Sequence, residues 1–228
     1  MQILITDVTE MHQGNYCVAG WDSKGGTMVR PLPNCSNWTG TQLTTYGIQP
    51  GATVQLDNAG AASSGIYPHR TEDTQIDLAS VKFVTAASNT WFGTGAPPLV
   101  STLAAAFQNN VQTTGVWKCA RKAAYVQEGT NIGSLAAVRI GRANFEFFEN
   151  DFNGNKSLRA YMVDNDARYS LPVVAKNLLG SDATSLPPTP CLRVSRCKVG
   201  RGPGGSPSMM LSRALSARRS GGPPPGYL

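Results

Sequence analysis

Short segments of alternating apolar and polar residues, separated by turn residues, fill the first part of the chain. Residues 2–8, 15–22 and 27–33 each have the period-two pattern or the β-rich content of a strand. Between the second and third segments, Gly25 and Gly26 supply the positive φ that a tight reversal needs. The sequence therefore predicts a strand followed by a tight hairpin.

A short helix and two further strands are predicted next. Residues 39–47 fit a short helix stopped by Gly47, and residues 51–57 and 74–84 have strand patterns. Three strands, a short helix and two strands is the order of an OB-fold, a five-stranded Greek-key barrel that binds oligonucleotides and oligosaccharides. Small barrels of several kinds share this order, so it favours the OB-fold without excluding the others.

The pattern becomes helical at residues 96–111. There Leu99, Leu103, Phe107 and Val111 recur every fourth residue, which places them on one face of a helix. The spacing predicts a helix that joins two halves of the chain.

Strand patterns return after this helix. The dipeptide Asn153-Gly154, between apolar runs at 145–152 and 155–163, is a strong signal for a two-residue hairpin turn. Three more segments, 115–126, 134–140 and 167–174, complete a second β-rich half. The elements together predict an all-β protein of two tandem small OB-like Greek-key barrels, with a first barrel at 1–95, a linking helix at 96–114 and a second barrel at 115–198.

The charge of the chain is concentrated at its end. The formal net charge of the 228 residues is +6, but residues 1–192 are close to neutral, and the last 36 residues hold seven Lys/Arg and no acid. From about residue 199 the composition is rich in Gly, Pro, Ser and Arg, which predicts a disordered basic tail over 199–228. The same composition is typical of an out-of-frame reading of a GC-rich gene, and the two interpretations stay open.

The N-terminal half carries a family resemblance. The runs "ILITDVTE", "GNYCVAGWD" and "MVRPLPNCSNW", followed by "YPHRTEDTQIDL", resemble bacterial dual OB-containing domain proteins over residues 1 to about 196. The resemblance implies two OB-type barrels in tandem, and nucleic-acid binding is inferred for that family from its fold. The chain departs from the family pattern in its Gly/Pro/Arg-rich tail.

One candidate binding surface lies around the first hairpin, at Tyr16, Trp21, Arg30 and Trp38. Aromatic rings stack on bases, and a guanidinium binds phosphate or stacks on a ring. The alternative is that both tryptophans are core residues and that Arg30 is a solvated strand end.

Two other segments are candidates for contact with nucleic acid. His69 and Arg70 lie in a connection between two predicted strands, where binding residues concentrate on a rigid barrel. The segment 117–125 interleaves basic and aromatic residues, as backbone-tracking grooves do; the candidates in it are Lys118, Arg121, Lys122 and Tyr125. The alternatives are a polar connection and a solvated face.

Catalytic and metal signatures are weak. The chain has two histidines and five widely spaced cysteines without a CxxC pair, and it lacks GxSxG, HExxH and phosphate-loop motifs. We therefore expect no enzyme activity, no cofactor and no metal site. A signal-peptide pattern and a long apolar run are also lacking, so we expect a cytoplasmic protein without a membrane partner.

These observations predict a non-catalytic binding module for single-stranded nucleic acid or a nucleotide-like ligand. The alternative is a protein-interaction or structural module within a larger bacterial assembly, which would use the same aromatic surface against a protein partner. Salt distinguishes the two, because binding to phosphates weakens steeply with added salt.

Overall fold

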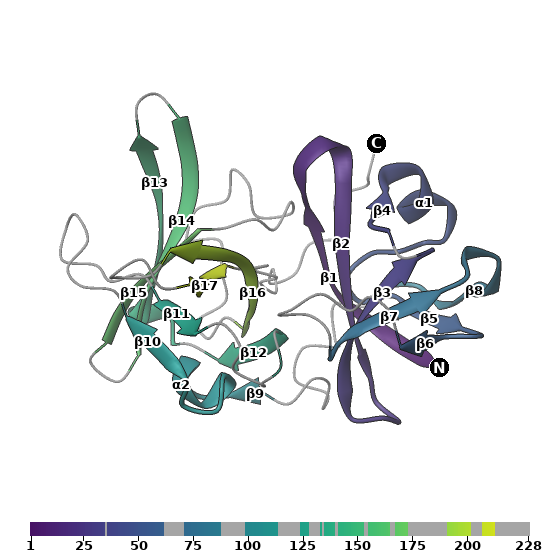
Figure 1. Ribbon diagram of the computed structural model, residues 1–228, viewed down its shortest axis with the longest axis horizontal. Helices are drawn as coiled ribbons and strands as arrows, with labels where there is room; N and C mark the ends of the chain where they lie inside the picture. Colours follow the sequence, from purple (N-terminus) through teal and green to yellow (C-terminus); the bar gives the residue numbers. More distant parts are fainter. Residues whose placement is uncertain are drawn as a thin grey trace.

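The structure is a computed structural model, and it shows a mainly β protein with two short α-helices among the residues it describes. Figure 1 shows the strands β1 to β8 in one lobe and β9 to β17 in another. The described residues are 1–34, 36–61, 71–87, 99–113, 124–127, 133, 135–139, 141–152, 155–164, 167–172, 191–201 and 207–212.

The first lobe contains one eight-stranded sheet. Its strands follow the order β6-β7-β3-β2-β1-β5-β8, and β4 pairs with β2 beside this path. Their bounds are β1 Gln2–Glu10, β2 Asn15–Asp22, β3 Thr27–Pro33, β4 Trp38–Thr39, β5 Thr53–Leu56, β6 Gly60–Ala61, β7 Asp73–Ile76 and β8 Val81–Thr85.

The sheet curls on itself, and the chain between β7 and β8 shows how. These two strands are consecutive, separated only by the 3₁₀ turn Leu78–Ser80, yet β7 pairs with β3 in parallel and β8 pairs with β5 in antiparallel fashion. A segment that follows β3 with its first half and β5 with its second half draws the two sides of the sheet together. The result is a curled, half-barrel sheet around one core.

Local sequence explains the elements that shape this sheet. At the β2–β3 reversal Gly26 has a φ of +64°, a conformation that glycine adopts at no steric cost. The predicted helix is present as α1, Gly40–Thr45, and begins with a capping box between Thr39 and Gln42. Gly47, with a φ of +63°, follows its end.

The core of the first lobe comes from the inner positions of these strands and from the short segment after α1. Its buried members are Ile3, Ile5, Val18, Val29, Trp38, Ile48, Val54, Leu56, Ile76 and Val81. They recur at alternate positions along β1 and β5, as expected for strands that turn one face to the core.

The second lobe is built from a six-stranded and a three-stranded sheet. The six-stranded sheet has the order β10-β11-β17-β16-β12-β9, and the other has the order β13-β14-β15. The bounds are β9 Leu99–Val100, β10 Val111–Thr113, β11 Ala124–Gln127, β12 Leu135–Arg139, β13 Phe145–Phe152, β14 Asn155–Asp164, β15 Ala167–Pro172, β16 Cys191–Arg201 and β17 Pro207–Ser212.

The hairpin predicted around Asn153-Gly154 is confirmed. Strands β13 and β14 pair in antiparallel register, and Phe152 faces Asn155 across the two-residue connection. A second core, separate from the first, joins this hairpin to the larger sheet and to α2, Leu103–Ala106. Its buried members are Leu103, Phe107, Val126, Val138, Phe145, Phe147, Ala160, Met162, Tyr169 and Leu171.

The prediction of one long helix at 96–111 is wrong. Its described part, 99–111, contains a two-residue strand, a four-residue helix and the start of another strand, and Leu99 and Val111 belong to β9 and β10. Gln108 and Asn109 have positive φ values of 51° and 61° directly after the helix, which no α-helix can continue through. The two central residues of the predicted face, Leu103 and Phe107, are nevertheless buried in the core.

Two side chains accept hydrogen bonds from the N-terminus of this short helix, and one of them lies on strand β14. The hydroxyl of Thr102 accepts a hydrogen bond from Ala105 N, and the buried carboxylate of Asp164 on β14 accepts one from Leu103 N at 2.6 Å. These contacts supply partners for helix N–H groups that a short helix cannot satisfy itself.

The predicted tail also differs from the structure. Residues 199–201 are the end of β16, and residues 207–212 form β17, which pairs with both β16 and β11. The expectation of disorder is therefore wrong for these residues. A composition rich in Gly, Pro and Arg did not reveal the short apolar run Met209–Leu211 that strand pairing uses.

Candidate functional site

Tyr16 and Trp38 lie on the inner face of the first sheet. They are direct partners in the pairing of β2 with β4, so their side chains point to the same side. Trp38 is 0% exposed, and its Nε1 donates a hydrogen bond to Pro31 O at 2.8 Å. Tyr16 is half-buried against the same core. Trp38 is thus a core residue, as the alternative interpretation expected, and its ring is not presented to a ligand.

Trp21 and Arg30 lie on the opposite, outer face. Trp21 pairs with Met28 across β2 and β3, and Arg30 lies two residues further along β3, so alternation places the three side chains on one side. The four residues of the predicted aromatic surface are therefore divided between the two faces of one sheet. Trp21 is only 9% exposed. We call this outer surface, with Cys17, Trp21, Met28 and Arg30, the hairpin face.

Arg30 is bonded to Asp73 on the neighbouring strand β7. Its Nε and Nη2 donate to the two carboxylate oxygens of Asp73, the second at 2.7 Å, and its backbone N–H donates to Glu72 O at 2.7 Å. The side chains are 13% and 3% exposed. A bidentate pair of this kind occupies the Nε/Nη2 edge of the guanidinium, one of the edges that could bind a phosphate.

Arg30 also influences Cys17, which lies beside it. Burial lowers the pKa of the Arg30 guanidinium, but its bonds to Asp73 and its proximity to Cys17 outweigh this and raise that pKa above its ordinary value. The pKa of the Cys17 thiol is raised by burial, against the opposing effect of Arg30. At neutral pH the guanidinium is therefore charged and the thiol is neutral, so Cys17 has little nucleophilic character.

The electrostatic surroundings of the hairpin face are acidic. Asp7, Glu72 and Asp73 are all buried nearby, and Asp7 and Asp73 act on Cys17 in the direction that keeps its proton. Among the described residues, three carboxylates lie around one guanidinium, which disfavours phosphate at the hairpin face. The predicted role of Arg30 as a phosphate contact has no support in this geometry.

The other predicted contact residues lie outside what the structure describes in full. His69, Arg70, Lys118, Arg121 and Lys122 are outside the described residues. The backbone of Tyr125 lies in β11, opposite Gln112 and Met210. These candidates stay predictions, and His69 and Arg70 belong to the connection between β6 and β7.

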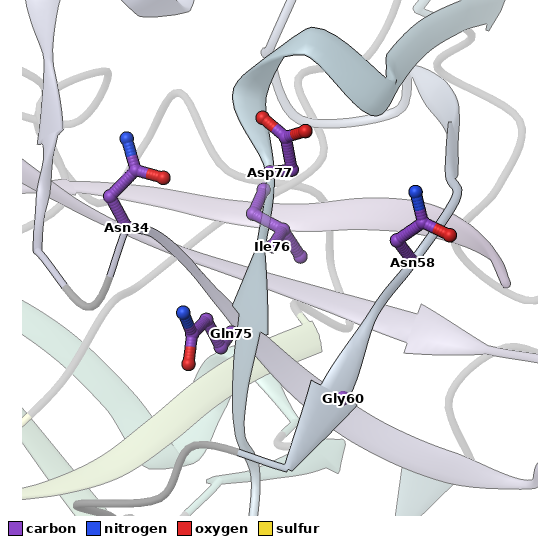
Figure 2. Close-up of a pocket in the computed structure, with 6 residues that line it drawn as sticks. All are labelled: Asn34, Asn58, Gly60, Gln75, Ile76 and Asp77. Carbon is purple, nitrogen blue, oxygen red and sulfur yellow. The ribbon is translucent and has the colours of Figure 1, made fainter.

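A pocket of about 220 Å³ opens on the first lobe, away from the predicted residues. Figure 2 shows polar side chains disposed around Ile76 on β7. The pocket is lined by three carboxamides, one carboxylate, one glycine and one isoleucine, which are Asn34, Asn58, Gln75, Asp77, Gly60 and Ile76. We call it the amide pocket.

Backbone conformation explains why asparagine stands at two of these positions. Asn34, at the end of β3, and Asn58, after β5, have φ values of 49° and 55°. Asparagine is the most tolerant residue of this left-handed conformation after glycine. Asn34 N donates to Ile76 O at 3.1 Å, which fixes the end of β3 against β7.

The other wall of the amide pocket is held by a turn. Asp77 caps the 3₁₀ turn, because its Oδ1 accepts a hydrogen bond from Ala79 N at 3.0 Å. Ser80 Oγ lies 2.5 Å from Asp57 O and 2.6 Å from Asp77 O. The hydroxyl thus links the end of β5 to the turn that follows β7, and this contact holds the pocket walls together.

Asp77 is the one charged residue among the six that line the pocket. A second carboxylate, Asp57, lies next to Asn58 in sequence but is paired with Lys82 Nζ at 2.7 Å. That hydrogen bond and a second one from Gln55 lower the pKa of Asp57. With Asp57 neutralised by its pair, Asp77 decides the sign of the charge at the pocket.

Within the part of the chain that the structure describes, no group of three or more His, Cys, Asp or Glu side chains is arranged to hold a metal ion. Over the same residues, no helix has the length and apolar content needed to cross a membrane.

Sequence reasoning missed the amide pocket. Its residues come from three separate segments and carry no aromatic or basic side chain, which are the usual signals of a nucleic-acid site. The signal that could have pointed to it is positional: polar amides directly follow two predicted strands, at Asn34 and Asn58. Residues at strand ends often lie close together on the same rim of a barrel.

The chain matches no protein-family model, and it matches no curated protein sequence. Among solved structures, it is similar to the Ifi202 HINa domain in complex with a 20-base-pair double-stranded DNA, with a TM-score of 0.42, 9% identity and coverage of 96% of this chain and 95% of that chain. The tetrameric p202 HIN2 gives a TM-score of 0.38 at 9% identity, covering 95% of this chain and 92% of that one. A murine DNA-binding protein bound to double-stranded DNA gives 0.37 at 9% identity, with 95% of both chains covered. No residue role is carried over from these distant likenesses.

Proposed function

We propose that this protein is a non-catalytic binding module of two tandem OB-like barrels, and that its first barrel binds single-stranded nucleic acid or a nucleotide-like ligand. The strand pairing of the first lobe supports an OB-type barrel. The bent segment β7–β8 pairs with both β3 and β5, β5 pairs with β1, and α1 precedes β5. This is the Greek-key order of an OB-fold.

Two separate hydrophobic cores support the division into two barrels. The first core ends at Val81, and the second begins with residues of α2. The proposed barrel at 1–95 holds the whole first core, and the second core combines residues of the proposed barrel at 115–198 with Leu103 and Phe107 of the segment 96–114. The segment 96–114, proposed as their junction, contributes α2 and two short strands rather than one helix.

The observation that carries the functional proposal is the amide pocket. In OB-folds, ligands contact the face of the second and third strands and the loops after the first and fourth strands. In this chain β5 is the proposed fourth strand, and Asn58 and Gly60 of the pocket lie in the connection that follows it. The pocket is therefore at a ligand-binding loop of the proposed fold, and its amides can both donate and accept hydrogen bonds.

The proposed contact region extends from the amide pocket into the connection between β6 and β7, where His69 and Arg70 provide positive charge for the phosphates. The cluster of Lys118, Arg121, Lys122 and Tyr125 remains a proposed contact of the second barrel. The hairpin face is left out, because Trp21 is nearly buried and Arg30 is bonded to Asp73.

The first test is binding of the full chain to labelled single-stranded DNA, single-stranded RNA and duplex DNA, followed by fluorescence anisotropy at two salt concentrations. We expect single strands to bind and added salt to weaken that binding. Gln75→Ala, which removes an exposed pocket amide, should lower the affinity about fivefold, in line with the loss of one hydrogen bond of about 1 kcal/mol.

Gln2→Ala is the matched control, since it makes the same change at an exposed strand position outside the amide pocket. It should leave the affinity unchanged. Equal losses in both variants, or no binding of any oligonucleotide by the parent chain, would refute the proposal.

A protein-interaction role is a second candidate function, favoured by the strand β8. This strand forms an end of the sheet path and exposes Phe83 at 52%, together with Val84. Exposed apolar residues on an edge strand are typical of surfaces that pair with another chain. Such binding would change little with salt and would be weakened by Phe83→Ser.

A further inference from the structure

We propose that the amide pocket selects nucleobases that carry an exocyclic amino group, and that Asp77 is the residue that determines this specificity. This inference rests on the proposed function and adds the class of base. It follows from the hydrogen-bonding polarity of the four polar side chains.

The three carboxamides do not define the ligand. Asn34, Asn58 and Gln75 each present one acceptor oxygen and one donor amino group, and a rotation of the amide exchanges them. They can match either polarity on a ligand. A pocket of amides alone would therefore accept any base edge that fits.

Asp77 differs because its polarity is fixed. An ionised carboxylate only accepts hydrogen bonds, and Asp77 has no ion-pair partner among the residues that the structure describes. One oxygen, Oδ1, accepts from Ala79 N, which orients the carboxylate at the pocket wall. The ligand group that meets Asp77 must be a donor, and a phosphate is repelled.

Among nucleobases this requirement separates two groups. Adenine, cytosine and guanine each carry an exocyclic amino group that donates, whereas thymine and uracil donate only through the ring N3–H, which lies between two carbonyl oxygens. A carbonyl directed at Asp77 would place two acceptors together, which costs the hydrogen bonds that both make with water.

The dimensions of the pocket agree with a single ring. Its volume of about 220 Å³ is below the range of about 300–1,000 Å³ for pockets that enclose a drug-sized ligand. The side chain of Ile76 is buried in the core, so the groups that the pocket offers to a ligand are the polar side chains around it (Figure 2).

The test compares oligo(dC) with oligo(dU), because cytosine and uracil share a ring and differ in the amino or carbonyl group at one position. Labelled strands of about 12 nucleotides lie within the range of about 4–16 nucleotides that one OB-fold covers. The full chain should bind oligo(dC) about tenfold more tightly than oligo(dU), as expected for one specific contact to a base.

Asp77→Asn is the decisive variant. Asparagine is also a good capping residue, so the bond from Ala79 N is kept while one acceptor is replaced by a donor. The ratio of the two affinities should fall to about one, since the new amide accepts either base. Glu146→Gln, on an exposed position of β13, makes the same change of net charge and should leave the ratio unchanged.

Competition distinguishes a base from a sugar as the recognised group. Cytidine should displace labelled oligo(dC), whereas ribose at the same concentration should not. Displacement by ribose would overturn the inference, because the donors would then be sugar hydroxyls.

The failures of the two proposals are distinguishable. Equal binding of oligo(dC) and oligo(dU) by the parent chain, or a ratio that survives in Asp77→Asn, would overturn the base preference and leave nucleic-acid binding intact. Failure of the parent chain to bind any oligonucleotide would overturn both.

Discussion

The hairpin face and the amide pocket belong to the same curled sheet, and they differ in exposure and in charge. The hairpin face carries Trp21 and Arg30, the residue types that bind nucleic acid most often, but the ring is nearly buried and the guanidinium is bonded to Asp73. The amide pocket carries no aromatic or basic residue, yet its polar side chains are exposed around a cavity.

The difference shows that residue type is a poor guide to binding when the same types also stabilise a core. Tryptophan and arginine contribute large contact areas and strong hydrogen bonds, which serve a ligand site and a folded interior equally well. Burial decides between the two uses. We therefore expect changes in the hairpin region to affect stability and changes in the pocket to affect binding.

The largest effect is expected from Trp38→Ala. The indole is fully buried and bonded to Pro31 O, so its removal should lower the free energy of unfolding by about 3–5 kcal/mol through lost burial and a cavity. Urea denaturation of the full chain measures this loss. Trp38→Phe keeps an aromatic ring but not the hydrogen bond, so its free energy of unfolding should lie between those of the parent chain and Trp38→Ala. A loss below about 0.5 kcal/mol for Trp38→Ala would show that the side chain is not core.

The next effect concerns the ion pair of Arg30 with Asp73. Removing one partner of a largely buried pair leaves an uncompensated charge, so Arg30→Met should cost about 3 kcal/mol of unfolding free energy. The double variant Arg30→Met/Asp73→Leu should recover most of this loss, because neither charge remains. A double-mutant cycle by urea denaturation measures the coupling between the two residues.

The same variants test the role of the hairpin face in binding. Oligonucleotide affinity of the folded double variant should equal that of the parent chain. A stable Arg30→Met variant that has lost its affinity for oligonucleotides would instead make the hairpin face the ligand surface.

The smallest effect is expected beside the amide pocket, at the exposed pair of Asp57 and Lys82. The hydrogen bond from Lys82 lowers the pKa of Asp57, so the stabilisation is present above the ordinary pKa of 3.8 and is lost as the pH falls through the lowered value. Lys82→Met should therefore reduce the melting temperature slightly near neutral pH. In strong acid, parent and variant should melt alike.

Lys24→Met, at an exposed position of the β2–β3 turn, is the matched control for that change of charge. It should not reproduce the pH dependence. A difference between the parent and Lys82→Met that persists in strong acid would show that Lys82 acts through packing rather than through Asp57.

The elements that the sequence predicted correctly depend on local chemistry. The β13–β14 hairpin lies where the dipeptide signal at 153–154 predicted it, and α1 is followed by Gly47 in the left-handed conformation that glycine adopts at little cost. The long helix at 96–111 failed because its apolar spacing took no account of Gln108 and Asn109, whose backbone ends the helix. The predicted tail failed because its composition does not reveal that β17 pairs with the neighbouring β16 and with β11, which lies far away in sequence.

The sequence by itself determined the mainly β character of the chain, the position of the first hairpin and the alternation that separates inner from outer residues. These properties are set within a few residues by side-chain period and turn chemistry. Only the tertiary structure decided that Trp38 is core, that Arg30 is bonded to Asp73, 43 positions away, and that three separate segments meet at the amide pocket. Each of these depends on long-range strand pairing, which no local pattern encodes.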